Sequence, residues 1–285
     1  MQRTLEHAAT PFGDLAYSDQ GQGPVALFVH GVFLNGSLWR HVIERVADMR
    51  RCIALDLLAH GHTRTPPEQD VSFRAQAEML AAFCDAIDVE RVDLVANDSG
   101  GGIAQIFAAR HPERIRSLVL TNCDVHDNWP PAAFEPTRQL VVGGGLAALG
   151  RQLLDNPEAA RQAFAVGYEH PETLAPDTLA TYLEPLLATP QAIRNLERWF
   201  GTAHDCSQTV EIEPQLRKLE APTLVVWGTA DPFFDVKWAY WLRDTIPGCS
   251  KVIELAGAKL FFPEERPDEL AAALREHWTG TPLVS

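Results

Sequence analysis

The 285-residue sequence lacks the patterns by which several classes of protein are recognised. No window approaches the roughly 20 apolar residues that cross a bilayer, and the first residues, MQRTLEHAATPFGD, contain no apolar stretch like that of a secretion signal. Positive charge is scarce, with 24 lysines and arginines against 38 aspartates and glutamates. The resulting net charge of −14 disfavours nucleic acid and anionic membranes as partners. We therefore expect a cytoplasmic protein that binds a small-molecule substrate, with no nucleic-acid or membrane partner.

Cysteine motifs and cofactor motifs are missing as well. The five cysteines are odd in number, widely spaced and without a CxxC pair, which argues against a disulfide framework and a zinc site. The GGG at 143–145 follows no strand-like run, so we interpret it as a helix junction rather than a phosphate loop. We expect no metal and no cofactor, and no feature of the sequence indicates an oligomeric state.

Apolar runs with strand-like composition alternate with helical segments over most of the chain. Near-continuous apolar strands separated by helices predict an α/β protein with a mostly parallel, doubly wound sheet that is covered on both faces. The runs lie at 25–31, 52–58, 92–98, 117–123, 223–229 and 251–257.

The alternation stops between the fourth and fifth runs. Residues 128–213 have helical patterns with breaks expected at prolines 157, 171, 176, 185 and 190. We predict an inserted helical cap there, between a first core part at 1–127 and a second at 214–285. A cap over the carboxyl edge of a parallel sheet would enclose the usual ligand crevice.

The third run ends in VANDSGGG at 95–102, where two neighbouring residues are candidate nucleophiles. A strand-to-helix turn that exposes a nucleophile needs small residues two positions before and two positions after it. Asp98 has alanine and glycine at these positions, whereas Ser99 has asparagine and glycine. The spacing therefore favours Asp98.

The segment LVANDSGGGIAQIFAARHPERIRSLVLTN resembles the nucleophile segment of the α/β-hydrolase superfamily. With Asp98 as the nucleophile, the paired glycines, the helix alanine and the His-Pro-Glu-Arg end fall in the family's register, and with Ser99 they are displaced. FVHGVFLNGSLWRHVI, DLLAHGHTRTP and VVWGTADPFF are similar to further loops of the same family. The resemblance implies an α/β-hydrolase fold, with the backbone N–H groups of Val32 and Ser99 forming an oxyanion hole.

An aspartate in this turn is typical of haloalkane dehalogenases, fluoroacetate dehalogenases and epoxide hydrolases. Their carboxylate attacks an sp³ carbon, and a histidine-activated water then hydrolyses the resulting ester. The resemblance implies catalytic roles for Asp98 and for Asp231 in the triad-acid loop. DNWPP at 127–131 is similar to the cap entrance of haloalkane dehalogenases, and Tyr168 and Tyr182 are available as the cap acids that epoxide hydrolases use.

The third catalytic residue of the family is missing. Counting back from EERP places the histidine position at Leu260, and no histidine lies between His204 and His277. Leucine cannot accept a proton, so an ester on Asp98 would lack its usual base. The halide-binding positions differ too, because valine and serine replace the Asn and Trp that these dehalogenases generally carry.

Several residues are candidates for an altered mechanism. Lys259 is next to the missing histidine, and Asp124 and His126 follow a strand at the edge where catalytic groups gather; a solvent-facing lysine and a surface-loop histidine are the structural alternatives. Asp98 and Asp231 could share a pocket without an imidazole, so that one has a raised pKa and acts as an acid. A turn-capping Asp231 is the alternative.

The pocket wall is expected to be apolar, because large apolar residues flank these loops. They are Phe33, Trp39, Trp129, Phe233, Leu260 and Phe261. The favoured hypothesis is an enzyme that attacks a small, largely apolar substrate through Asp98, with a non-standard or absent base. The alternatives are a lyase, isomerase or cyclase that uses Asp98 and Asp231, and a ligand-binding protein without turnover.

Overall fold

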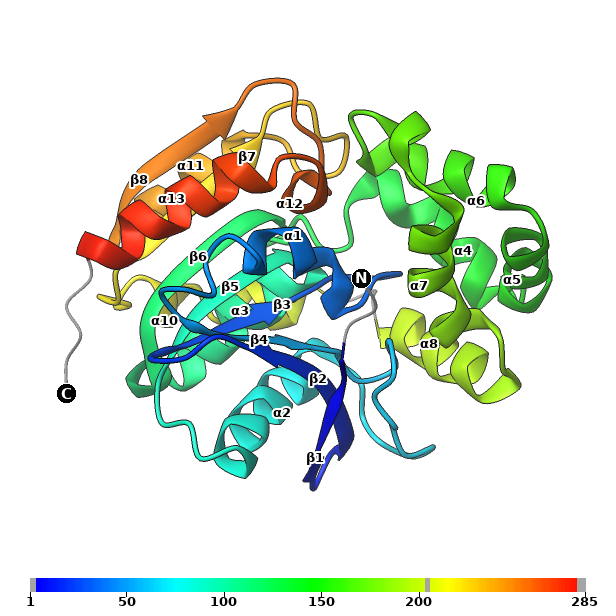
Figure 1. Cartoon of the computed structure of the whole chain (residues 1–285), viewed down its shortest axis with the longest axis horizontal. Helices are drawn as coiled ribbons and strands as arrows, with labels where there is room; N and C mark the ends of the chain where they lie inside the picture. Colours follow the sequence, from blue (N-terminus) through cyan, green and yellow to red (C-terminus); the bar gives the residue numbers. More distant parts are fainter. Residues whose placement is uncertain (1–3, 203–205, 281–285) are drawn as a thin grey trace.

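The computed structural model describes residues 4–202 and 206–280, and its centre is an eight-stranded sheet (Figure 1). The strand order is β1-β2-β4-β3-β5-β6-β7-β8. All six strand-like runs of the sequence contain a strand, and the predicted α/β architecture is confirmed. The strands are β1 (Glu6–Thr10), β2 (Gly13–Gln20), β3 (Val25–Val29), β4 (Arg51–Leu55), β5 (Val92–Asp98), β6 (Ile115–Cys123), β7 (Thr223–Gly228) and β8 (Cys249–Leu255).

The first two strands form an antiparallel hairpin that the sequence patterns did not predict. β1 pairs with β2 and β2 with β4 in antiparallel fashion, whereas the remaining pairs, from β4 through β3 to β8, are parallel. β1 is an edge strand in which only Ala8 is fully buried, so it has no continuous apolar run. An edge strand half in water needs little apolar sequence, and this explains the omission.

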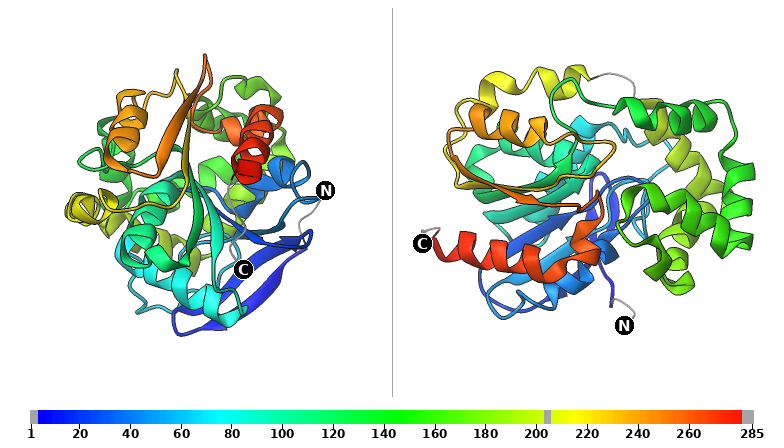
Figure 2. Two further views of the ribbon diagram at one scale, coloured as in Figure 1. Left: turned by 90° about the vertical axis from the view of Figure 1, so that its left-hand side faces the viewer. Right: turned by 90° about the horizontal axis from the view of Figure 1, so that it is seen from above.

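Helices cover both faces of the sheet. Figure 2 shows α1 and α13 on one face and α2, α3 and α11 on the other. Across the described ranges, no helix combines the length and the apolarity that crossing a bilayer requires. The helices of this part are η1 (Gly36–Trp39), α1 (Arg40–Ile43), α2 (Phe73–Ala86), α3 (Ser99–Arg110), η2 (Pro112–Arg114), α9 (Ser207–Val210), α10 (Glu213–Leu216), α11 (Lys237–Thr245), α12 (Phe262–Glu265) and α13 (Pro267–Gly280).

A second group of helices lies between β6 and β7 in sequence and gathers at one end of the sheet (Figure 1). Proline stands in the first turn of several of them, where its missing N–H has no cost. Pro185 is different, because it lies inside α7 and not at the predicted break. The helices are η3 (Ala132–Phe134), α4 (Glu135–Val142), α5 (Leu146–Asp155), α6 (Pro157–Phe164), η4 (Ala165–Gly167), η5 (Pro171–Thr173), α7 (Pro176–Leu187) and α8 (Pro190–Thr202).

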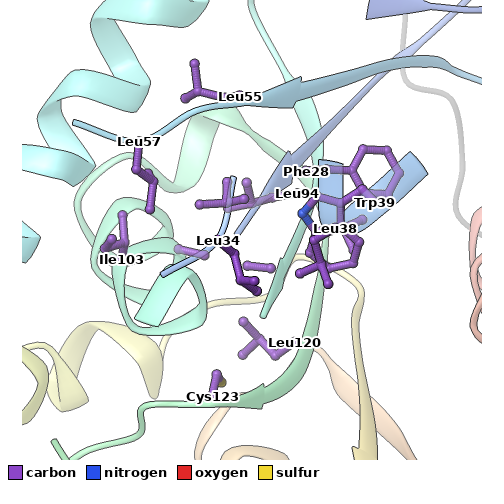
Figure 3. Close-up of a cluster of buried hydrophobic side chains, with 14 of the residues drawn as sticks. Phe28, Leu34, Leu38, Trp39, Leu55, Leu57, Leu94, Ile103, Leu120 and Cys123 are labelled. Atoms are coloured by element: carbon purple, nitrogen blue, oxygen red, sulfur yellow. The ribbon is translucent and has the colours of Figure 1, made fainter. Parts of the chain in front are cut away.

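The central strands are buried along their whole length, and they carry the main apolar core. Every residue of β3 and β5 is buried, as expected for strands covered on both faces. Trp39 belongs to this core, with its ring centroid 5.4 Å from that of Phe28 (Figure 3). The prediction that Trp39 lines the pocket is therefore wrong. The sequence could not distinguish the two positions, because apolar residues near a catalytic loop occur both in the core and in pocket walls.

Candidate active site

The turn between β5 and α3 holds Asp98 in a backbone conformation that side chains rarely adopt. Its φ is 57° and its ψ is −136°, and α3 begins at the next residue. Glycines make the close packing around this turn possible. A Cβ placed on Gly31 would lie 2.1 Å from Asp98 Oδ2, and one on Gly100 would lie 2.3 Å from the His30 carbonyl oxygen. The strain is thus maintained by packing against the loop after β3.

Two backbone N–H groups hold the Asp98 carboxylate. The Val32 N–H donates to Asp98 Oδ2 at 3.0 Å, and the Ser99 N–H donates to the same carboxylate. These are the two groups that the resemblance placed in an oxyanion hole. Burial and the charge of Asp231 raise the pKa of Asp98 to about 7, although both N–H groups act in the opposite direction.

Asp231 lies on the loop after β7, where hydrogen bonds fix both of its carboxylate oxygens. Phe233 N–H and Phe234 N–H donate to Oδ1 at 2.8 and 3.4 Å, and Asn122 Nδ2 donates to Oδ2 at 2.8 Å. Burial raises the pKa of Asp231 to about 7 against these donors and the charge of Lys259. Asp231 therefore affects the pKa of Asp98 through its charge, because hydrogen bonds within the protein already occupy both of its carboxylate oxygens.

Asp124 follows the end of β6 and lies beside Asp98. Its backbone N–H donates to the Asp98 carbonyl oxygen at 3.4 Å. Its side-chain Oδ1 is buried and has no hydrogen-bond partner. Burial, together with the charges of Asp98 and Asp231, raises the pKa of Asp124 well above its usual value.

An apolar cavity of about 430 Å³ lies above Asp98, between the sheet edge and the helices that precede β7. Asp98, Asp124 and the expected pocket residues other than Trp39 contribute to its wall. No histidine of the described chain lines it. The full lining is Val32, Phe33, Asp98, Ser99, Asp124, Trp129, Pro130, Pro131, Phe134, Pro136, Thr137, Leu140, Leu149, Leu153, Ala163, Phe164, Val166, Leu183, Trp199, Phe233, Phe234, Leu260 and Phe261.

Leu260 forms part of the cavity wall, and its loop is fixed at the backbone. The side chain is buried, and its carbonyl oxygen accepts a hydrogen bond from Asn97 Nδ2 at 3.1 Å. The next residue, Phe261, donates its N–H to the Gly167 carbonyl oxygen at 2.9 Å. The loop is thus held between the sheet and the helices above it.

The remaining acid and base candidates lie outside the cavity wall. His126 Nε2 is 3.1 Å from Glu213 Oε2, and its ring lies 4.9 Å from that of Trp241, so it faces α10 and α11. Lys259 is half-buried; it does not line the cavity, but its charge lowers the pKa of Asp231.

The two tyrosines considered as acids, Tyr168 and Tyr182, are also directed elsewhere. Tyr168 and Tyr182 each donate a hydroxyl to Glu264 Oε2, at 2.9 and 2.7 Å, and Tyr182 accepts a hydrogen bond from Arg40. Neither tyrosine lines the cavity. Within the part of the chain that is described, no group of three or more His, Cys, Asp or Glu side chains could hold a metal ion.

The sequence analysis did not identify the cavity residues that come from the helices before β7. Leu140, Leu153 and Phe164 come from α4, α5 and α6, and Trp199 comes from α8. The available signal was the strong amphipathic pattern of α5, α6 and α8. That pattern shows which helix face is covered, but not whether another helix or a cavity covers it.

Comparison with known proteins agrees with this architecture. The family model for the alpha/beta hydrolase fold matches residues 24–265, and the chain belongs to that family. Haloalkane dehalogenase 2 of Mycobacterium tuberculosis (strain ATCC 25618 / H37Rv) is 27% identical over 272 residues, which cover 93% of this chain and 92% of that protein.

Two solved structures illustrate the similarity of fold. The haloalkane dehalogenase DbeA from Bradyrhizobium elkani USDA94 has a TM-score of 0.81 at 23% identity, with 98% of each chain covered. The epoxide hydrolase CorEH has a TM-score of 0.80 at 18% identity, with 97% of this chain and 98% of that chain covered. These relatives bear the names of hydrolases that act on small molecules.

Proposed function

We propose that this protein is an enzyme in which Asp98 attacks a carbon atom of a small, largely apolar substrate. The observation that carries the proposal is the pair of backbone N–H groups, from Val32 and Ser99, that hold the Asp98 carboxylate at the wall of an apolar cavity. The Val32 N–H binds Oδ2, so we assign the attack to Oδ1. The oxygen that becomes the ester carbonyl is then Oδ2, which already accepts the Val32 N–H.

The composition of the cavity supports an apolar substrate. Its wall combines aromatic and aliphatic side chains with a small polar group around Asp98, a pattern that buries apolar surface and orients one reactive end. Residues 128–213 would act as the cap, because helices within this range supply much of the wall. The similarity in sequence to a haloalkane dehalogenase supports a substrate with a leaving group on an alkyl carbon.

Leu260 would take the position of the base that hydrolyses the ester in these relatives. A leucine side chain cannot activate water, so the ester on Asp98 is expected to persist unless another group removes a proton. The alkylated enzyme would therefore accumulate with a substrate whose leaving group departs without a proton.

This proposal can be tested by intact-mass measurement after incubation with 1-bromohexane, followed by peptide mapping. We expect one hexyl group on Asp98 in the wild-type protein and none in the Asp98→Asn variant, because a neutral amide is a poor nucleophile. The matched control is Asp127→Asn, the same change at a side chain that is 63% exposed, and this variant should still be alkylated. Alkylation that persists in the folded Asp98→Asn variant would contradict the proposal.

A second candidate function is acid/base chemistry such as elimination, isomerisation or cyclisation. It is favoured by the raised pKa values of Asp98 and Asp231, both about 7, with no imidazole lining the cavity in the described chain. Turnover that depends on Asp98 but leaves no covalent adduct at any time would support this function. Binding without adduct or turnover would support a ligand-binding protein.

A further inference from the structure

The apolar cavity contains a small group of polar atoms that have no partner within the protein. Ser99, Asp124 and Trp199 line the cavity, and Ser99 Oγ, Asp124 Oδ1 and Trp199 Nε1 are buried and form no hydrogen bond within the protein. Each of these residues is only 2% exposed. A buried polar group without a partner is unfavourable, so such a set in residues of an apolar wall indicates the binding position of a polar group of the ligand.

A chain of contacts connects these three residues. Ser99 follows Asp98 directly, and the Asp124 N–H donates to the Asp98 carbonyl oxygen. A Cβ on Gly102 would lie 3.1 Å from Asp124 Cβ and 2.7 Å from Cε2 of Phe73. The centroid of the Phe73 ring is in turn 6.1 Å from that of Trp199. Asp124 and Trp199 are therefore neighbours of one aromatic ring.

The charges around the cavity favour a neutral Asp124. Asp98 and Asp231 repel a third negative charge, and no lysine, arginine or histidine occurs among the described residues of the cavity wall. A buried carboxyl group without a counter-charge or a hydrogen-bond donor is more stable when protonated. Asp124 then offers an O–H donor, and Trp199 offers an N–H donor.

We propose that Asp124 is a catalytic acid that protonates an oxygen leaving group while Asp98 attacks, and that the substrate is an apolar epoxide. This inference rests on the proposed function of Asp98 and adds the class of substrate and the source of the proton. The Trp199 N–H would bind the same oxygen. The cap tyrosines cannot do so in this arrangement, because both hydroxyls donate to Glu264.

Two carboxyl groups take part in the first step, with Asp98 as the nucleophile and Asp124 as the proton donor. Asp98 Oδ1 forms a bond to a ring carbon, the bond between that carbon and the ring oxygen breaks, and the oxygen takes the proton of Asp124. The products are a hydroxyalkyl ester of Asp98 and the carboxylate of Asp124. A base is thereby created beside the ester, although no histidine lines the described cavity wall.

The second step consumes one water molecule. The Asp124 carboxylate takes a proton from water as the water oxygen attacks the ester carbonyl carbon. The tetrahedral intermediate breaks its bond to the alcohol oxygen, and the departing alkoxide takes the proton of the newly formed Asp98 acid. Asp98 is again a carboxylate, Asp124 is again protonated, and the product is a diol.

An alkyl halide would stop after the first step. The halide leaves as an anion and takes no proton, so Asp124 stays neutral and no base is generated. The mechanism therefore predicts turnover of an epoxide and a persistent ester from the corresponding alkyl bromide, on the same enzyme and at the same Asp98.

The test compares wild-type protein, Asp124→Asn and the control Asp127→Asn, using 1,2-epoxyhexane and 1-bromohexane. Asp127 lies three residues further along the loop, and its side chain is 63% exposed. Single-turnover alkylation of Asp98 is followed by intact mass. Because an amide cannot transfer a proton, Asp124→Asn should slow alkylation by the epoxide about 100-fold or more, and alkylation by the bromide less than about threefold. The control should match wild type.

The outcomes separate this inference from the proposed function. Equal slowing with both reagents, or no slowing with the epoxide, would overturn the role of Asp124 and leave Asp98 as nucleophile. Turnover of 1-bromohexane as fast as that of the epoxide would overturn it too. The absence of an Asp98 adduct with both reagents in wild type, without diol formation, would overturn both proposals.

A second variant keeps the test decisive if Asp124→Asn does not fold. Trp199→Phe removes only the N–H donor and retains an aromatic ring. It should weaken binding of 1,2-epoxyhexane about fivefold, as expected for one hydrogen bond, whereas Asp127→Asn should leave that binding unchanged. Unchanged affinity for the epoxide would contradict the oxygen-binding position.

Discussion

Leu260 is a buried side chain at the cavity wall, on a loop whose backbone is fixed by Asn97 and Gly167. A histidine there would start from a rigid backbone and face the ester that we expect on Asp98. We predict that Leu260→His shortens the lifetime of the hexyl ester at least about 100-fold, since general base catalysis typically contributes that much. The measurement is the decay of the alkylated mass after removal of 1-bromohexane.

Leu183→His is the control for this change, because Leu183 lines the same cavity from α7. A histidine at that position adds an imidazole without placing it on the loop after β8. Equal acceleration by both variants would show that any imidazole in the cavity suffices. No acceleration in a folded Leu260→His variant would contradict the assignment of this position.

At the scale of elements, the strand-turn-helix unit of β5 and α3 depends on its contact with the loop after β3. Gly31→Ala would place a methyl group 2.1 Å from Asp98 Oδ2, so the carboxylate would have to leave the Val32 N–H. We predict a loss of about 1–3 kcal/mol in the free energy of unfolding from overpacking, and a larger relative loss in the alkylation rate of Asp98.

Denaturant unfolding and intact-mass kinetics measure these two effects. The matched control is Gly201→Ala in α8, where a Cβ would meet no atom within 4 Å. Alanine also favours the helix over glycine, so this control should be neutral or slightly stabilising. If Gly31→Ala alkylates at the wild-type rate, the loop does not hold the carboxylate in the way described.

The helices before β7 show where prediction from sequence ends at this scale. The breaks expected at prolines 157, 171, 176 and 190 each coincide with the start of a helix, because proline fits the first turn of a helix. Pro185 also looked like a break, but α7 continues through it. Local sequence does not contain the tertiary contacts that keep a helix intact around an internal proline.

For the whole molecule, the buried carboxyl groups couple folding to pH. Asp98 and Asp231 have pKa values of about 7 in the folded protein, above those of an unfolded chain, so the folded state binds more protons between about pH 4 and pH 7. Their contribution to stability is complete below this interval and is lost as the pH rises through it.

We therefore predict that Asp98→Asn raises the melting temperature at pH 8 and changes it much less at pH 5. At pH 8 the variant removes a buried charge, whereas at pH 5 it replaces a neutral acid by a neutral amide. Thermal unfolding at the two pH values measures the difference. An equal shift at both values would contradict the raised pKa of Asp98.

Much of the fold could be predicted from the sequence because the buried parallel strands require apolar runs. The spacing around Asp98 also predicted the turn that the structure contains, since only small residues fit there. The edge hairpin, the core position of Trp39 and the direction of Tyr168 and Tyr182 could not be predicted. Each depends on partners far away in sequence, such as Glu264, which binds both tyrosines.

The contacts of Glu264 have a consequence for access to the cavity. Tyr168, next to η4, and Tyr182 of α7 both bind Glu264 of α12. Arg40 of α1 binds the same carboxylate at 2.5 Å, so these contacts hold the two parts of the chain together. Leu140 and Val166 line the cavity and are also 45% and 46% exposed, so they mark an apolar entrance to the cavity. We expect a substrate to enter between these two residues with its reactive end first, because Asp98 lies at the cavity wall, and to leave the hydrogen bonds of Glu264 intact.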